Sequence, residues 1–202
     1  VAVEKRDRSG SEILYLNQDM RELDLYSTVG TVYCLCDSIN YLIKDEDVAK
    51  TFKRVFDFLY PGGLFIFDFN TDHKYRNVIG TRTIAEDRDD VSFIWENSYD
   101  AESGINEYNL TIFIKNSYFS DFKDEPEEEL NTFESDDNFF EDLYRKHSET
   151  HLQRGYSFTD MTAFVEEAGF ILVDAFDLDM EKRREPGDIS ERIFIVAKKN
   201  MN

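Results

Sequence analysis

The sequence is poor in several features that would mark a common class of protein. It has two cysteines, Cys34 and Cys36, and nine glycines, none of which stands in a Gly-x-Gly pattern. The cysteines occupy positions i and i+2 of one predicted strand, which holds them too far apart for easy disulfide bonding. We therefore interpret them as reduced thiols buried in a strand, in preference to a metal-binding or redox pair. The glycine pattern leaves this sequence without a glycine-rich cofactor loop.

Basic residues are also scarce, and so are long apolar runs. The chain has 23 Lys and Arg against 43 Asp and Glu, which gives a formal net charge of -20 at pH 7. Nucleic acids and anionic membranes are themselves polyanions, so neither is expected as a partner. No segment is apolar over the length that a bilayer span requires, and the polar start of the chain does not resemble a signal peptide. We expect a cytoplasmic protein.

What the sequence does contain is a set of apolar runs that end abruptly in acids. Three such runs end near Asp19, Asp37 and Asp68, and the second continues as Cys36-Asp-Ser-Ile-Asn-Tyr41. In open α/β sheets, ligands bind outside the carboxyl ends of parallel strands. We therefore expect the three acids to contribute to one shared pocket.

The order of the predicted elements indicates an α/β fold. Apolar residues recur at helical spacing from Val48 to Leu59, after acids that suit the first turn of a helix. A strand, a helix and a strand joined by short links imply a parallel right-handed crossover. The predicted elements are strands at 13–18, 31–36 and 63–69, helices at 45–59 and 160–168, the latter capped by Thr159, and antiparallel strands at 171–176 and 192–197.

Antiparallel strands are predicted between these two groups of elements. Strand-like segments at 92–99 and 105–114 flank the turn sequence Asp100–Gly104, which predicts a hairpin. A further strand is expected over residues 143–156.

We therefore divide the chain into a core and an insertion. The α/β core comprises 1–80 and 157–202, and the antiparallel β insertion comprises 81–156. Within the insertion, residues 118–142 are intensely acidic with interspersed phenylalanines. This composition predicts a solvated loop or, because of its aromatic content, a lid over the pocket.

Six motifs, taken in their order along the chain, resemble those of a known family. They resemble the class I S-adenosylmethionine-dependent methyltransferases, of the small bacterial type with an antiparallel insertion over the active site. The likeness extends over nearly the whole chain and implies a Rossmann-like sheet, an S-adenosyl-L-methionine cofactor and a small-molecule methyl acceptor. The motifs are Gln18–Leu23, Cys36–Leu42, Leu59–Asn70, Glu149–Arg154, Ala168–Phe170 and Ser190–Phe194.

The resemblance implies roles at the cofactor. Asp19 would accept a hydrogen bond from the adenine amino group, a role that suits a carboxylate, and Met20 would contact the adenine ring. Cys36 and Asp37 would line the methionine side of the cofactor. The resemblance assigns no metal ion.

Further residues are candidates for the acceptor side. The resemblance places Asn40 and Tyr41 facing the methyl group and the acceptor. Trp95 and Arg154 are candidate substrate contacts, although packing within a sheet is the favoured interpretation of Trp95. His151 could act as a base near neutral pH, so we predict Tyr41 and His151 as the catalytic residues.

The segment around His151 also allows other interpretations. His147, Glu149 and His151 share one face of a predicted strand, as the ligands of a facial metal site would. Such a site needs ligands that converge, whereas these stand in one straight row. A pocket wall is preferred to a metal site, and a polar surface that faces solvent is an equally favoured interpretation.

One departure from the family pattern gives a second hypothesis. The glycine loop of the family and the acid of its next strand would lie upstream of Val1, so we expect that the sequence lacks an N-terminal portion. Alternatively, the chain is an inactive methyltransferase-like fragment that serves as a binding or assembly module. Exposed strand edges would then favour association, including formation of a homo-oligomer. The acidic segment favours a cationic or neutral methyl acceptor.

Overall fold

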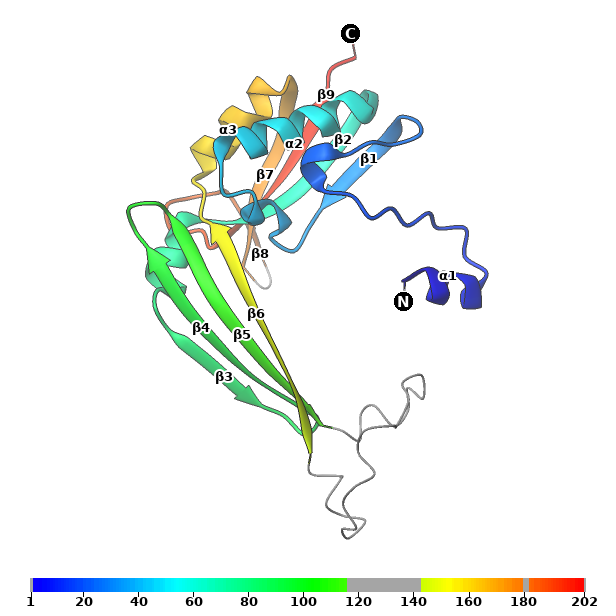
Figure 1. Ribbon diagram of the computed structural model, residues 1–202. Coiled ribbons are helices and arrows are strands. Elements are labelled where there is room, and N and C mark those ends of the chain that lie inside the picture. The colour runs from blue at the N-terminus through cyan, green and yellow to red at the C-terminus, as the bar shows by residue number, and fades with distance from the viewer. Residues whose placement is uncertain (1, 116–142, 180–181, 202) are drawn as a thin grey trace.

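Two β-sheets organise the structure (Figure 1). The computed structural model describes residues 2–115, 143–179 and 182–201. The five-stranded sheet has the strand order β1-β2-β9-β7-β8, and the four-stranded sheet has the order β3-β4-β5-β6. The strands of the five-stranded sheet are β1 (Val29–Cys34), β2 (Leu59–Asn70), β7 (Phe170–Asp179), β8 (Lys182–Arg184) and β9 (Arg192–Lys199).

The five-stranded sheet has the α/β arrangement that the sequence predicts. β1 and β2 are parallel and are connected through α2 (Asp45–Phe58), while β9 pairs antiparallel with both β2 and β7. Figure 1 shows α2 and α3 (Phe158–Glu167) together over one face of this sheet. The described helices include none that is both long and apolar enough to cross a bilayer.

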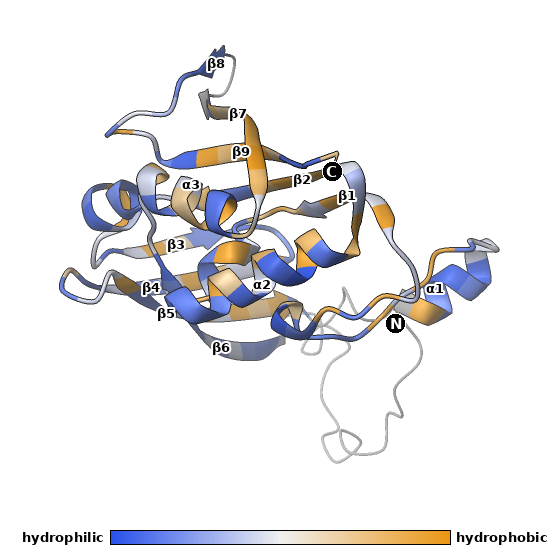
Figure 2. Cartoon of the chain, turned by 90° about the horizontal axis from the view of Figure 1, so that it is seen from above, coloured by the Kyte–Doolittle hydropathy of each residue, from blue (hydrophilic) through white to orange (hydrophobic). Residues whose placement is uncertain are grey.

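The core forms where α2 meets the sheet. Val48, Phe52 and Val55 recur at helical spacing on α2, and all three are buried. The Phe52 ring lies 5.2 Å from that of Phe65 and 5.0 Å from that of Phe67, both on β2. Aromatic pairs at this separation stabilise a core beyond the area that they bury. Figure 2 shows that α2 has both hydrophobic and hydrophilic residues around its axis, as expected for a helix with one face on the core.

The helix α3 begins two residues earlier than predicted. Ser157, not Thr159, is the N-cap, since its side chain accepts a hydrogen bond from the backbone N–H of Asp160. The carboxylate of Asp160 accepts from the backbone N–H of Ser157 in return, which completes a capping box.

The four-stranded sheet is antiparallel throughout and extends away from the core as an arm (Figure 1). β4 and β5 form the predicted hairpin, and Gly104 adopts a φ of 71° in its turn. Glycine suits this position because it lacks the Cβ that makes positive φ costly. The strands are β3 (Thr83–Asp87), β4 (Val91–Asp100), β5 (Ile105–Lys115) and β6 (Tyr144–Arg154).

The start of the chain differs from the prediction. Residues 2–9 form α1 (Ala2–Ser9), but the strand predicted at 13–18 is absent, because no described segment pairs with these residues. Ile13 and Leu14 are consequently 56% and 61% exposed. An apolar run becomes a strand only when a neighbouring strand supplies the ladder. The lid predicted at 118–142 lies outside the described residues.

Candidate functional site

The backbone changes direction sharply after β1. Cys36 and Asp37 have φ angles of 61° and 51°, in the left-handed region that residues with a side chain seldom adopt. The chain then enters the short helix η2 (Ser38–Tyr41). Residues held in this way cluster at functional sites.

The turn also separates the two cysteines. Cys36 lies beyond the end of β1 and is exposed, so the prediction that both thiols are buried in one strand is wrong for Cys36. Cys34 is half-buried in β1, and burial raises the pKa of its thiol to about 11. A thiol with so high a pKa is a poor nucleophile and metal ligand, which agrees with a structural role for Cys34.

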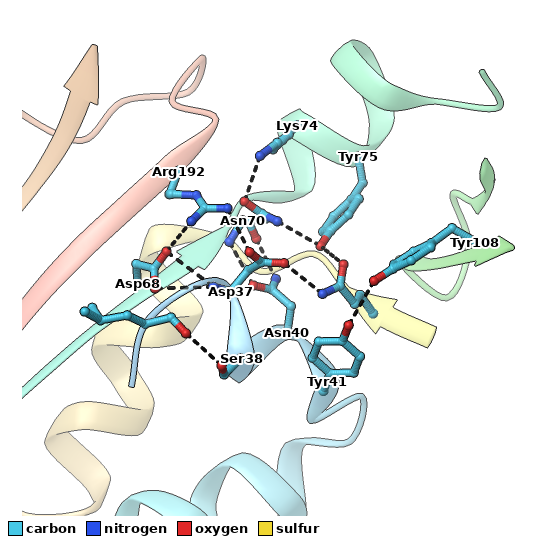
Figure 3. A network of polar contacts seen from close by, with 12 residues as sticks. Asp37, Ser38, Asn40, Tyr41, Asp68, Asn70, Lys74, Tyr75, Tyr108 and Arg192 are labelled. Atoms are coloured by element: carbon cyan, nitrogen blue, oxygen red, sulfur yellow. Dashed lines mark hydrogen bonds and ion pairs between the residues drawn. The ribbon is translucent and has the colours of Figure 1, made fainter. Parts of the chain in front are cut away.

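A buried carboxylate lies behind this turn. Asp68, on β2, is 1% exposed, and its carboxylate accepts a hydrogen bond from the backbone N–H of Asp37 at 3.3 Å. Arg192, at the start of β9, donates from Nη1 to Asp68 at 2.7 Å and from Nη2 to Asp37 at 2.8 Å (Figure 3). Burial raises the pKa of Asp68, and the charge of Arg192 opposes that effect. Two of the three strand-end acids therefore meet through one guanidinium.

A second set of hydrogen bonds joins the core to the arm. Gln153, on β6, donates from Nε2 to the carboxylate of Asp37 at 2.9 Å and accepts from the hydroxyl of Tyr75 at 2.8 Å. The Asn70 side chain donates to that same hydroxyl at 3.1 Å. Burial raises the pKa of Tyr75, so its hydroxyl stays protonated and keeps this donor role. The strand ends and the root of the arm are thus one polar network (Figure 3).

Asn40 has a position different from the one predicted for a substrate contact. It is fully buried, and its Nδ2 donates to the backbone oxygens of Asn70 and Arg154 at 2.8 and 2.7 Å. Its Oδ1 accepts from the backbone N–H of Asn70 at 2.8 Å. With its amide occupied by main-chain groups, Asn40 fastens β2 to the end of β6. The prediction placed this side chain toward the acceptor, and the structure instead uses it to hold the two sheets together.

Tyr41 and His151, the two predicted catalytic residues, are in contact. The Tyr41 hydroxyl lies 3.1 Å from Nδ1 of His151 and 2.9 Å from the hydroxyl of Tyr108. Nε2 of His151 lies 3.1 Å from a carboxylate oxygen of Glu149. The Tyr108 and His151 rings also stack, with centroids 4.7 Å apart. Glu149, His151, Tyr41 and Tyr108 are therefore linked in this order by hydrogen bonds, which connect η2 to the arm.

A cavity of about 270 Å³ lies between the strand ends of the core and the root of the arm. One side is polar and the other is aromatic and apolar, which is the usual composition of a small-molecule site. Tyr108 lines this cavity, so the hydrogen-bonded chain ends at its wall. The lining residues are Asp37, Asn70, Lys74, Tyr75, Ile79, Trp95, Tyr108, Leu110, Gln153 and Arg192.

The remaining predicted residues occupy three kinds of position. Trp95, on β4, lines the cavity. Arg154 belongs to the root of the arm but donates to Asp45 at 2.6 Å and to the backbone oxygen of Ile43. Its guanidinium is thus committed to the segment that leads into α2, and the structure does not place it in the cavity lining.

Asp19 and Met20 lie at a separate short helix. Asp19 is the N-cap of η1 (Met20–Glu22), and Arg21 donates to its carboxylate from the backbone and from the guanidinium. These hydrogen bonds hold the pKa of Asp19 at about 2. Arg21 also reaches Asp47 of α2 at 3.5 Å, and Met20 packs against the core. Asp19 is therefore exposed and ionised, but it does not join the pair of Asp37 and Asp68.

His147, Glu149 and His151 stand in a row on β6, and the carboxylate of Glu149 is hydrogen-bonded to Nε2 of His151. Within the described ranges no group of three or more His, Cys, Asp or Glu side chains could hold a metal ion.

Sequence reasoning missed several residues of the site. Alternation along β5 and β6 places Tyr108 and His151 on the same face, and they are paired across the ladder. The alternation can be seen within each strand of the sequence, but the pairing of Tyr108 with His151 follows only from the register of β5 and β6. Lys74 and Tyr75 gave no signal, because they lie on a short π-helix, η3 (Lys74–Ile79). The residues that were missed are Lys74, Tyr75, Tyr108, Gln153 and Arg192.

The chain is similar to known bacterial proteins. No family model matches the chain. Two curated bacterial proteins named "Putative methyltransferase" do match it. YqeM of Bacillus subtilis (strain 168) is 30% identical over 195 residues, which cover 95% of this chain and 68% of YqeM. The other, from Geobacillus sp. (strain WCH70), is 28% identical over 200 residues, covering 98% of this chain and 70% of the relative.

Solved structures agree with these relatives. An S-adenosylmethionine-dependent methyltransferase from Clostridium acetobutylicum ATCC 824 superposes with a TM-score of 0.78 at 25% identity, covering 98% of this chain and 70% of that one. DesVI of Streptomyces venezuelae, at 15% identity and a TM-score of 0.66, shares the fold over 98% of this chain and 70% of its own.

The fold, the strand-end site and these likenesses define an enzyme of the class I S-adenosylmethionine-dependent methyltransferases. Its cofactor is S-adenosylmethionine. Within this class, the chain belongs to the methyltransferase family that includes YqeM.

Proposed function

We propose that the chain methylates a small molecule bound in the cavity between the strand ends and the arm. The observation that carries this proposal is the hydrogen-bonded chain from Tyr108, at the cavity wall, through Tyr41 to His151. An acceptor in this cavity would have a proton acceptor within reach, and it would lie beside the left-handed turn at Asp37.

The residues present fit one side of the cofactor. Asp19 offers an exposed, ionised carboxylate, the kind of acceptor that an exocyclic adenine amine requires, and Met20 stands beside it. Cys36 and Asp37 would line the methionine side, since their turn leads directly to the cavity. When bound, the cofactor supplies a methyl group on a positively charged sulfur. The carboxylate of Asp37 favours such a charge nearby.

The direction of proton movement follows from the hydrogen bonds. If Nε2 of His151 carries the hydrogen that bonds to Glu149, Nδ1 is free to accept from Tyr41. Tyr41 can then accept from Tyr108, and Tyr108 from a group in the cavity. Glu149 acts as a positioning residue, because it selects the tautomer of His151. In this proposal Tyr41 and His151 would carry the proton of the acceptor, and Tyr108 would link them to the cavity.

Methyl transfer balances with this arrangement. The bound cofactor would supply the methyl group from its sulfonium, with S-adenosylhomocysteine as the leaving group, and an oxygen or nitrogen of the acceptor would take the methyl group and release its proton. The proton released by the acceptor passes to His151 through the two tyrosine hydroxyls. Positioning and water exclusion supply much of the rate in such displacements, so no covalent enzyme intermediate is needed.

The test has two readouts. Calorimetry with S-adenosylhomocysteine measures cofactor binding directly. Incubation with deuteromethyl-labelled S-adenosylmethionine and a small-molecule extract, followed by mass spectrometry, detects labelled products. We expect binding and at least one labelled product that disappears in a His151→Gln variant. Absence of S-adenosylhomocysteine binding would sink the proposal.

A further inference from the structure

Lys74 brings a cation to the cavity, and among the described residues it makes no ion pair. It is the first residue of η3, it lines the cavity, and its Nζ donates to Oδ1 of Asn70 at 2.9 Å. In the parts of the chain that the structure describes, no carboxylate lies within ion-pair distance of this ammonium. An ammonium has three donors, and a neutral amide takes one of them. Burial lowers the pKa of Lys74 and the charge of Arg192 lowers it further, while the nearby carboxylates oppose both effects.

Three carboxylates act on Lys74 electrostatically, and two of them, Asp37 and Asp68, have other partners, while Glu191 lies beyond ion-pair distance among the described residues. Asp37 receives Arg192 on one oxygen and Gln153 on the other, at 2.8 and 2.9 Å. Asp68 receives Arg192 at 2.7 Å and the backbone N–H of Asp37. Both acids are held by these hydrogen bonds, so neither is available to Lys74 without breaking the network. The remaining donors of Lys74 are left for a ligand.

The opposite side of the cavity has a different character. Trp95, Leu110 and Ile79 supply apolar surface from β4, β5 and η3, and Tyr108 adds an aromatic ring. At about 270 Å³, the cavity is slightly smaller than the range of roughly 300–1,000 Å³ in which ligand pockets fall, so it suits a small ligand. A ligand that satisfies both sides is small and flat, with an anionic group at one end.

We propose that the methyl acceptor is a small aromatic carboxylate whose anionic group pairs with Lys74 and whose ring lies against Trp95. This inference rests on the proposed function, because it assigns the acceptor to the same cavity. The carboxylate serves recognition, and the methyl group goes to a ring O–H or N–H that faces Tyr108. The cavity therefore favours an anion, in contrast to the cationic or neutral acceptor expected from the acidic segment at 118–142, which lies outside the described residues.

Trp95 makes the proposal directly measurable. It is the single tryptophan of the sequence, so intrinsic fluorescence reports on this cavity wall alone. Benzoate and benzamide have nearly the same shape and differ in charge. We expect benzoate to change Trp95 fluorescence and to bind about tenfold more tightly than benzamide, since a charge-assisted hydrogen bond contributes more than a neutral one.

Variants separate the role of Lys74 from general effects. Lys74→Met should abolish the preference for benzoate, and Lys74→Arg should retain it. Lys53→Met is the matched control, because Lys53 lies exposed on α2 and pairs with Asp57. Equal binding of the two compounds to the wild-type chain would overturn the proposal, as would failure of both to bind. A preference that survives in folded Lys74→Met would do the same, and the wild-type comparison holds even if that variant does not fold.

Calorimetry with S-adenosylhomocysteine distinguishes failure of the acceptor assignment from failure of the proposed function. If S-adenosylhomocysteine binds but benzoate shows no preference, the acceptor class is wrong and the proposed function stands. If benzoate is preferred but S-adenosylhomocysteine does not bind, the anion site stands and the proposed function fails.

Discussion

The guanidinium of Arg192 lies 2.7 Å from the carboxylate of Asp68, a side chain that is 1% exposed. Removing one partner of a buried ion pair leaves an uncompensated charge and costs about 3–5 kcal/mol. We therefore expect Arg192→Met to lower the free energy of unfolding by about that amount at neutral pH, measured by urea denaturation. Adding Asp68→Asn should recover most of the loss, because the amide is uncharged and still accepts from Asp37. A single variant as stable as the wild type would contradict this assignment.

The same carboxylate makes stability depend on pH. Burial raises the pKa of Asp68 above its ordinary value of 3.8, so the folded state binds this proton more tightly than the unfolded state does. The stability that protonated Asp68 contributes is fully present below its pKa in the unfolded state, and it is lost as the pH rises through its pKa in the folded state. The unfolding free energy of the wild type, minus that of Asp68→Asn, should thus fall as the pH rises above the ordinary pKa of 3.8 and through the raised pKa of folded Asp68. A difference that rises over this interval would mean that Arg192 outweighs burial.

Tyr41 is the central link between Tyr108 and His151, so its hydroxyl is the group to remove. Tyr41→Phe should lower kcat by about 100-fold, since positioned acid–base groups contribute at least that factor. The affinity for S-adenosylhomocysteine should remain unchanged, because the lost group serves the proton of the acceptor. Steady-state kinetics with an acceptor found by mass spectrometry, together with calorimetry, checks both parts. Equal losses in binding and in kcat would point to a structural role for Tyr41.

Asp19 offers a test of the cofactor side. Asp19→Ala should weaken S-adenosylhomocysteine binding about tenfold if its carboxylate accepts from the adenine amine. The variant also releases Arg21, which donates to that carboxylate at 2.6 Å. Arg21→Ala is therefore the control, because it removes the same ion pair and leaves the acceptor in place. The adenine assignment is wrong if both variants bind with the same affinity.

Gly155 tests the junction between the arm and the core. A Cβ at this residue would lie 2.8 Å from Cα of Asp72 and 3.1 Å from Cδ2 of Tyr75. We expect Gly155→Ala to cost about 1–3 kcal/mol, as overpacking does elsewhere, and to reduce benzoate binding because Tyr75 lines the cavity. Gly30→Ala is the matched control, since nothing lies within 4 Å of its Cβ position. Urea denaturation and fluorescence titration measure the two effects, and equal stability of the two variants would exclude this tight contact.

Sequence patterns predicted the elements that depend on local spacing. Val48, Phe52 and Val55 mark α2, and the turn at Asp100–Gly104 separates the strands of a hairpin. The strand expected at 13–18 failed because a ladder needs a partner, which a local pattern cannot supply.

The site was predictable only in part, for a related reason. Tyr41 and His151 were chosen for their chemistry, and the fold places them in contact across 110 positions of sequence. Asn40 has equally suitable chemistry, but the fold uses its amide for main-chain hydrogen bonds. Which of two polar side chains is left free depends on the packing of segments distant in sequence. Lys74 could not be found from the sequence, because its role depends on its position in the cavity and on the absence of an ion pair with the described carboxylates.

Asn40 and Gln153 attach the arm to the core, so residues of the arm and residues of the core can be substituted independently. The turn at Cys36 and Asp37 belongs to the core, whereas Trp95, Tyr108 and Leu110 project from the arm. Substitutions in those strand rows would alter the shape offered to an acceptor without moving the backbone of the turn. Changes in the arm would therefore alter only the surface that Trp95, Tyr108 and Leu110 supply, while Lys74 and the turn at Asp37 stay in place in the core.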